Sequence, residues 1–177
     1  MSDVGRSLVL VGPRGAGKTT LARAVAGHLA YEFRDTDDLL AQAVGCDAGV
    51  FLEREGESVF RAIEGPIVAE ALGSNQGGVL AVGGGAVLSE NVRNLLAHPA
   101  HFVVFLSAPT AVLVDRLRSG SFRPPLTNLP LDEEVGILAR DREPLYRAVS
   151  DLDLDTNSLD VPGCQAAILG IMGLGGG

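Results

Sequence analysis

The residues with the clearest chemical potential lie near the start of the chain, where residues 12–20 read GPRGAGKTT. This stretch matches G-x-x-x-x-G-K-[ST], which is typical of a loop whose backbone N–H groups bind phosphate oxygens. Lys18 is the only lysine among the 14 basic residues of the chain. We expect its ammonium to reach the β- and γ-phosphates of a nucleotide and the Thr19 hydroxyl to bind Mg²⁺. The nucleotide-contacting residues predicted here are Gly12, Gly15, Ala16, Gly17, Lys18, Thr19 and Thr20.

The flanking sequence supports this interpretation. An apolar run, SLVLV, precedes the loop at 7–11, and Leu21, Val25 and Leu29 follow it at helical spacing. Strand, glycine loop and helix is the order that a phosphate loop requires. An ordinary glycine turn between a strand and a helix is the alternative, and the motif together with the sole lysine disfavours it.

Three classes of nucleotide-binding protein share such a loop, and the chain separates them. A GTPase needs an Asn-Lys-x-Asp motif, which a chain with a single, already committed lysine lacks. A motor or transport ATPase usually has an apolar strand that ends in Asp, whereas the runs at 78–82 and 101–106 end in glycines and in Ser107. The remaining class is the small-molecule kinases. Such a kinase needs an acceptor site, a carboxylate near the acceptor hydroxyl and a basic lid.

Three aspartates, Asp35, Asp37 and Asp38, follow the apolar start of residues 31–40. In an extended segment Asp35 and Asp37 share one face. One can then organise Mg²⁺ through water while the other accepts the proton of a substrate hydroxyl. A helix-capping acidic cluster is the alternative, and we expect Asp38 in a first helical turn facing solvent.

An arginine–glutamate pair lies within residues 51–72, where Phe60, Ile63, Ile67 and Val68 form an apolar helical stripe. Arg61 and Glu64 are three residues apart and therefore neighbours on the helix. They are either a solvated surface ion pair or an arginine held by Glu64 so that it presents its fork to a substrate carboxylate.

A basic, irregular segment at 115–130 contains Arg116, Arg118 and Arg123 among Gly, Ser and Pro residues. We predict a mobile lid over about 118–131 that closes on ATP and brings an arginine onto the transferred phosphoryl group. A solvated loop between helices is the alternative. Residues 131–149 then predict a helix interrupted near Pro144, with Arg147 towards its end.

Three consecutive glycines, Gly83, Gly84 and Gly85, follow an apolar run in VLAVGGGAVL. They can form a turn, a second phosphate loop or a wall without side chains that lets a small ligand approach the backbone closely.

Five apolar runs predict strands at 7–11, 31–34, 78–82, 101–106 and 151–154. Because helical segments alternate with them, we expect one α/β domain over residues 1–177, with a parallel sheet covered by helices on both faces. Ligands should bind at the carboxyl ends of the strands. We expect a closing helix at 161–172 and a disordered tail at 173–177.

Composition restricts the partners of this 177-residue chain. A net charge of −8 disfavours nucleic acid as a partner, and no apolar run is long enough to span a membrane. Cys46 and Cys164 have no metal-ligand spacing, and His98 and His101 are interpreted as surface-loop residues. We therefore expect a cytoplasmic chain with idle thiols, and a monomer because no heptad pattern occurs.

The ordered set of motifs resembles the shikimate kinase family over nearly the whole chain. The resemblance rests on GPRGAGKTT, DTD, REGESVFRAIE, VGGGAV, SFRPPL, EPLYRAV and DTN. It implies a P-loop kinase fold with a five-stranded parallel sheet and a lid, and Mg²⁺- and ATP-dependent phosphorylation of the 3-hydroxyl of shikimate, a step of aromatic amino-acid biosynthesis.

The resemblance also implies roles for individual residues. Asp35 matches the metal-site aspartate, and Asp37 matches the residue that binds the substrate hydroxyls and is the candidate base. Arg61, braced by Glu64, and Arg147 match the pair that holds the shikimate carboxylate. The remaining matches are the lid arginine Arg123, the adenine-packing Arg116, and Gly83, Gly84 and Gly85 lining the shikimate pocket.

The chain departs from the family pattern at Pro125 in the lid, at Leu52 where an aromatic is common, and in the glycine-rich segment 46–51. Two other functions are therefore considered: a kinase for another small polyol acid such as gluconate, and a nucleotide-binding regulator without catalysis. The Arg61, Glu64 and Arg147 set favours shikimate, and the intact catalytic positions disfavour the regulator.

Overall fold

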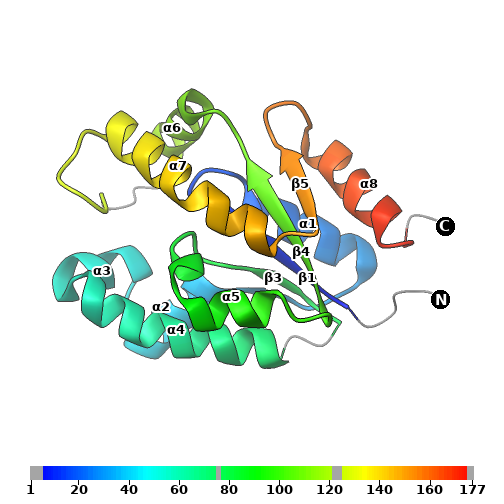
Figure 1. Cartoon of the computed structure of the whole chain (residues 1–177), viewed down its shortest axis with the longest axis horizontal. Helices are drawn as coiled ribbons and strands as arrows, with labels where there is room; N and C mark the ends of the chain where they lie inside the picture. Colours follow the sequence, from blue (N-terminus) through cyan, green and yellow to red (C-terminus); the bar gives the residue numbers. More distant parts are fainter. Residues whose placement is uncertain (1–5, 75–76, 121–124, 175–177) are drawn as a thin grey trace.

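A computed structural model describes residues 6–74, 77–120 and 125–174, and five strands within them form one sheet. The sheet order is β2-β3-β1-β4-β5, and every neighbouring pair is parallel. The strands are β1 (Ser7–Val11), β2 (Phe33–Asp35), β3 (Val79–Ala81), β4 (His101–Ser107) and β5 (Leu152–Asp155). Helices lie on both faces of this sheet, which confirms the predicted three-layer α/β fold (Figure 1).

Helices connect the strands that follow one another in the chain, as crossovers between parallel strands require, and α8 follows the last strand. They are α1 (Lys18–Leu29), α2 (Thr36–Val44), α3 (Ala48–Glu55), α4 (Glu57–Ser74), η1 (Ala86–Leu88, a 3₁₀ turn), α5 (Glu90–Leu96), α6 (Thr110–Ser119), α7 (Leu131–Val149) and α8 (Val161–Ile171). Asp47, Ser89 and Asp160 begin α3, α5 and α8 by accepting hydrogen bonds from backbone N–H groups of the first turn.

Two apolar layers hold the helices to the sheet, because successive strand residues point to opposite faces. Leu8 and Leu10 of β1 pack with side chains of α1, α6 and α8. Val9 and Val11 of the same strand pack with side chains of α4, η1 and α5 and with Tyr146 of α7. The sheet is therefore buried on both faces, as its continuous apolar runs predict.

The strand register brings the loops that carry the predicted chemistry to one edge of the sheet. Leu10 pairs with Ala81, and Asp35 pairs with the same residue from the other side. Val11 pairs with Phe105 on β4, and Ser107 pairs with Asp155 on β5. The segments that follow β1, β2, β3 and β5 thus begin side by side at the carboxyl end of the sheet.

Several predicted boundaries are wrong. The segment 51–72 is divided between α3 and α4 by Gly56, whose φ of +83° ends α3. The predicted strand at 31–34 begins at Phe33 and ends at Asp35. Helix α7 is not interrupted at Pro144. Pro144 has no N–H to donate to the carbonyl of Arg140, four residues earlier. Both residues are exposed, so water can bind that carbonyl oxygen.

The predicted disordered tail is wrong for its first two residues. Leu174 donates its N–H to the Leu169 carbonyl at 2.9 Å and packs against the apolar layer of α1 and α8. Residues 175–177 lie outside the described residues. Among the helices of the described segments, none combines the length and the apolar character that a membrane crossing requires.

Candidate active site

The predicted phosphate loop lies between β1 and α1 and is packed against the neighbouring strand. A Cβ at Gly12 would overlap the carbonyl oxygen of Leu106 on β4, and the φ of Gly12 is +147°. Only glycine fits this approach of two backbones. The Lys18 ammonium lies over the loop and donates to the carbonyls of Gly12 at 2.8 Å and Pro13 at 2.9 Å. The loop is therefore shaped by glycines and spanned by the only lysine.

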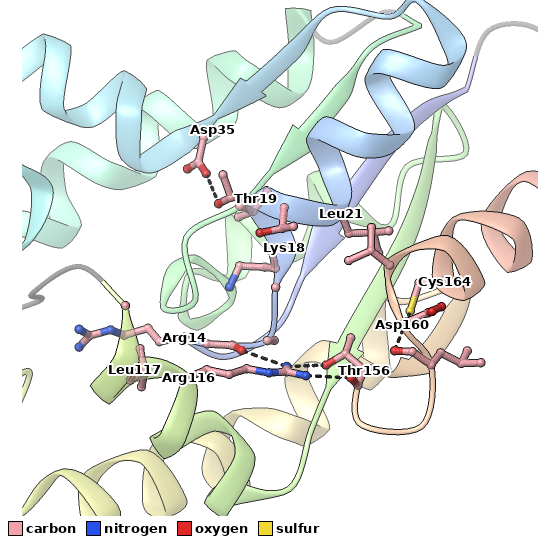
Figure 2. Close-up of a pocket in the computed structure, with 18 of the residues that line it drawn as sticks. Arg14, Lys18, Thr19, Leu21, Asp35, Arg116, Leu117, Thr156, Asp160 and Cys164 are labelled. Atoms are coloured by element: carbon pink, nitrogen blue, oxygen red, sulfur yellow. Dashed lines mark hydrogen bonds between the residues drawn. The ribbon is translucent and has the colours of Figure 1, made fainter.

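A cavity of about 560 Å³ opens beside this loop (Figure 2). It is lined by Arg14, Gly15, Ala16, Gly17, Lys18, Thr19, Thr20, Leu21, Asp35, Asp37, Val82, Arg116, Leu117, Gly120, Thr156, Leu159, Asp160, Val161 and Cys164. Of this set, the sequence predicted the loop residues from Gly15 to Thr20, both aspartates and Arg116, but not Arg14. Gly12, also predicted, is not among the lining residues and acts through loop shape.

The first turn of α1 and the end of β2 provide a pair of oxygen ligands. Thr19 donates its hydroxyl to Asp35 at 2.7 Å (Figure 2). The other Asp35 oxygen caps α2 by accepting the N–H of Asp37 at 3.0 Å. Mg²⁺ prefers hard oxygen ligands and usually binds one or two carboxylates together with water and substrate phosphates. The Thr19–Asp35 pair fits such an ion.

The sequence predicted that the two aspartates share one face of an extended segment, but the structure places them in different elements. Asp35 is the last residue of β2, whereas Asp37 lies in the first turn of α2. Both nevertheless line the same cavity. The turn of the helix directs them to different neighbours, Asp35 to Thr19 and Asp37 to the glycine segment after β3.

Arg116 links three segments around the far end of the cavity. Its guanidinium donates to the Thr156 hydroxyl and carbonyl, each at 2.8 Å, and to the Gly15 carbonyl at 3.2 Å (Figure 2). Leu117, Leu159 and Val161 form apolar walls there. This slot, between a fixed guanidinium plane and apolar side chains, has the character of a site for a flat base.

The sequence analysis also missed Leu117, Leu159, Asp160 and Val161, and Cys164, interpreted as an idle thiol, lines the cavity as well. Their types are ordinary for a surface loop and a helix start. The rule that ligands bind at the carboxyl ends of parallel strands would have included the segment after β5, because that strand ends beside β4.

The glycine triplet lies against the other predicted pocket. A Cβ at Gly83 would lie 2.8 Å from Asp37 Oδ1 and 3.1 Å from Glu64 Oε1, and one at Gly85 would overlap the Arg61 guanidinium. Gly84 accepts a hydrogen bond from the Tyr146 hydroxyl at 2.5 Å. The triplet is therefore a backbone wall that acidic and basic side chains approach closely, and it is not part of the cavity around the phosphate loop.

The predicted contact between Arg61 and Glu64 is present. Arg61 Nη1 lies 2.5 Å from Glu64 Oε2, and Glu57 lies 3.4 Å from the other terminal nitrogen. Glu64 is only 5% exposed. Burial raises the pKa of the Glu64 carboxyl, and the Arg61 guanidinium opposes that shift. The pair is therefore not a solvated surface pair, and Arg61 has a fixed orientation.

The structure does not place Arg147 with this cluster. Its side chain is 51% exposed and pairs with Glu143 at 2.9 Å and with Asp153 of β5. Arg147 lies at the last turn of α7, where its guanidinium lies over the Phe105 ring. Arg147 therefore contacts Glu143, Asp153 and Phe105, and its joint role with Arg61 on a substrate carboxylate stays a prediction.

Arg142, five residues earlier on α7, is the arginine of this helix whose charge acts on Glu64 and Tyr146. Arg142 is 8% exposed, and its charge opposes the raised pKa values of both Glu64 and Tyr146. Its signal in the sequence is its position on the buried stripe of α7, seven residues after Val135 and four before Tyr146. An arginine on an apolar stripe needs a partner, and here it faces the Arg61–Glu64 side of the sheet edge.

Tyr146 fixes the wall against the core. Its ring stacks on Phe105 with 5.1 Å between centroids, and burial raises the pKa of Tyr146 to about 12. The phenol therefore stays protonated and donates to the Gly84 carbonyl. Arg123, the predicted lid arginine, lies outside the described residues.

A phosphate loop, a hydroxyl–carboxylate pair suited to Mg²⁺ and a neighbouring Arg61–Glu64 cluster against a glycine wall are the features of a P-loop kinase of small molecules. The family model for shikimate kinase matches residues 14–168. Curated shikimate kinases from Francisella tularensis subsp. novicida and Francisella philomiragia subsp. philomiragia are each 36% identical over 159 residues, which is 88% of this chain and 88% of each relative. The chain belongs to the shikimate kinase family.

Solved structures agree. The shikimate kinase from Acinetobacter baumannii in complex with shikimate matches with a TM-score of 0.86 and 33% identity, over 94% of this chain and 92% of that one. The shikimate kinase from Bacteroides thetaiotaomicron matches with a TM-score of 0.84 and 25% identity, over 96% and 99% of the two chains.

Proposed function

We propose that this chain transfers the γ-phosphoryl group of ATP to the 3-hydroxyl of shikimate, giving shikimate 3-phosphate and ADP. One observation carries the proposal beyond family membership: Asp37 stands between the two pockets. It lines the cavity beside the phosphate loop and also lies against Gly83 of the glycine wall. A carboxylate at that junction can meet a hydroxyl from one side and a phosphoryl group from the other.

Asp37 acts as the base in this reaction. Its carboxylate takes the proton of the 3-hydroxyl as that oxygen forms a bond to the γ-phosphorus, and the bond from the γ-phosphorus to the bridging oxygen of ADP breaks. Lys18 holds the β- and γ-phosphate oxygens and neutralises charge that develops on them. Arg123, the lid arginine predicted from the sequence, is proposed to neutralise charge on the transferred phosphoryl group in the same way.

Thr19 and Asp35 hold the metal ion in this proposal. Mg²⁺ bound there supplies charge neutralisation on the phosphate oxygens. The loop N–H groups from Gly15 to Thr20 orient the phosphates, with Gly12 setting the shape of the loop, and Arg116 packs against the base. These roles pre-organise the donor, so the transfer needs little movement of the donor side.

The acid is held by Arg61 and Arg142 in place of the predicted Arg61 and Arg147. Glu64 orients Arg61, and the backbone of Gly83, Gly84 and Gly85 lies flat beside the ring. Arg61 and Arg142 both lie close to Glu64 and Tyr146. A substrate carboxylate bound there can therefore accept charge-assisted hydrogen bonds from both arginines. We also propose that the chain is a cytoplasmic, monomeric, single-domain enzyme.

The test couples ADP formation to NADH oxidation with a panel of acids that includes shikimate and gluconate. We expect turnover with shikimate and a product whose phosphorus resonance couples to the proton at carbon 3. Phosphorylation of gluconate without shikimate would assign another acceptor, and ATP binding without turnover on any acid would support a regulator.

A further inference from the structure

A buried carboxylate that the reaction does not use lies at the start of α7. Glu134 is 2% exposed, yet its two oxygens accept hydrogen bonds from three donors of the segment that precedes the helix. The Leu126 N–H lies 3.0 Å from Glu134 Oε2, and the Thr127 N–H and hydroxyl lie 2.6 and 2.8 Å from the same oxygen. A buried carboxylate is stable only with such partners, so Glu134 fastens residues 126–127 to α7.

The same carboxylate faces the phosphate loop. The Arg14 guanidinium lies 3.8 Å from Glu134 Oε1, and the Arg14 side chain is 19% exposed. Figure 2 shows Arg14 leaving the loop away from the Arg116–Thr156 contact, on the side opposite the base slot. Arg14 is thus the loop residue that connects the phosphate site with the segment held by Glu134.

The Arg14–Glu134 pair also lies next to residues of both proposed binding regions. Arg14 lines the cavity beside the phosphate loop, and its backbone nitrogen would lie 3.7 Å from a Cβ on Gly84. A second cavity of about 20 Å³ is bordered by Arg14, Glu134, Arg142 and Tyr146. A shift of this pair therefore acts on the donor side and the acceptor side together.

We propose that Glu134 is a positioning residue that ties the Leu126–Thr127 segment to the phosphate loop through Arg14. Occupation of the loop by nucleotide phosphates then tightens that segment, which begins three residues after Arg123. The positions of the segment and the phosphate loop are therefore coupled, and this coupling keeps the phosphoryl group aligned with the acceptor hydroxyl. The expected effect on kcat rests on the proposed kinase function, whereas the link between Glu134, Arg14 and the Leu126–Thr127 segment does not.

Amide hydrogen exchange tests the link directly. In the ¹⁵N-labelled chain, saturating Mg·ADP should slow exchange at Leu126 and Thr127 by at least about fivefold, the lower end of typical coupling between sites. Arg14→Gln touches neither amide, yet it should abolish most of that slowing. An unaltered chain without ADP-dependent slowing, or an Arg14→Gln variant that keeps it, would refute the link.

Kinetics separates positioning from a purely structural contact. Arg14→Gln and Glu134→Gln should each lower kcat roughly 10- to 100-fold, because misplacement of about 1 Å has effects of that size. The double variant should be no slower than the slower single variant, since the two residues act as a unit. Additive losses would overturn the proposal.

Asp132→Asn is the matched control. Asp132 lies on the same first turn of α7 and pairs with Arg118 at 2.6 Å, but both side chains are more than 60% exposed. Its kcat and exchange response should stay within about twofold of the unaltered chain. If Glu134→Gln does not fold, Arg14→Gln decides the question alone. If the chain phosphorylates no acid, the exchange experiment still decides the link while the kinase proposal fails.

Discussion

Replacing Gly85 with alanine isolates the contact between the glycine wall and the arginine of the acid pocket. Gly85 has a right-handed backbone conformation, with φ −94° and ψ −8°, so alanine is compatible with the local chain. The added Cβ would lie 2.5 Å from the Arg61 guanidinium carbon and would overlap both terminal nitrogens. The methyl group therefore acts on the arginine and not on the backbone.

The structure gives the size of the effect. The guanidinium carbon must retreat by about 1 Å, from 2.5 Å to the 3.4 Å at which ordinary van der Waals contact begins. A displacement of that size can cost about 10²-fold in a reaction that depends on alignment. A hydrogen bond to a charged group contributes about 1.5–3 kcal/mol. We therefore expect the KM for shikimate to rise roughly 10- to 100-fold.

Stability should change much less. Overpacking a core typically costs about 1–3 kcal/mol, and we expect the lower end because the atoms that move are the end of a flexible side chain. Urea denaturation should show this. The KM for ATP should stay within about threefold, because Gly85 does not line the cavity beside the phosphate loop.

Gly65→Ala provides the control. It adds the same methyl group to α4, where nothing lies within 4 Å, and should leave both KM values unchanged. Steady-state kinetics with each substrate varied at saturating levels of the other measures both variants. An unchanged shikimate KM for Gly85→Ala, or an equal rise in the two KM values, would refute the assignment of the glycine wall to the acid pocket.

The other predictions concern the base, the second arginine and the tyrosine of the wall. Asp37→Asn should lower kcat roughly 10²- to 10⁴-fold with nearly unchanged ATP affinity by calorimetry, and an unchanged kcat would contradict its role as base. Arg142→Gln should weaken acid binding by roughly 2–3 kcal/mol, because Arg142 is buried and its charged contact is lost. Arg147→Gln should change the acid KM by less than about threefold, because Arg147 forms an exposed ion pair. A larger effect of Arg147→Gln than of Arg142→Gln would support the sequence prediction that Arg147 binds the acid. Tyr146→Phe should lower the free energy of unfolding by about 1–2 kcal/mol, because the Gly84 carbonyl loses its donor. Since the phenol pKa is raised from 10.0 to about 12, this contribution should be constant between about pH 6 and about pH 9 and lost as pH rises from 10 towards 12. Urea denaturation across that range is the check, and a loss already complete by about pH 9 would mean that the phenol ionises early.

Much of the donor side could be predicted from sequence because its determinants are local. The spacing of Gly12, Gly17, Lys18 and Thr19 lies within one loop and one helical turn, and the flanking apolar runs define the strand and helix around it. The pairing of Thr19 with Asp35 follows from parallel strands that end at one edge. Even so, the turn after β2 directs Asp35 and Asp37 differently from an extended segment, because Asp35 caps α2.

The sequence by itself therefore determined the fold class, the phosphate loop and the Arg61–Glu64 contact, all of which depend on short-range spacing. The tertiary structure decided which arginine of α7 faces the acid pocket. Residues 142 and 147 are five apart and so point to different sides of a helix that turns once in about 3.6 residues. The rotation of α7 about its axis is fixed by the burial of Val135 and Tyr146 against the sheet. That long-range packing turns Arg142 inward and leaves Arg147 to Asp153 at the surface.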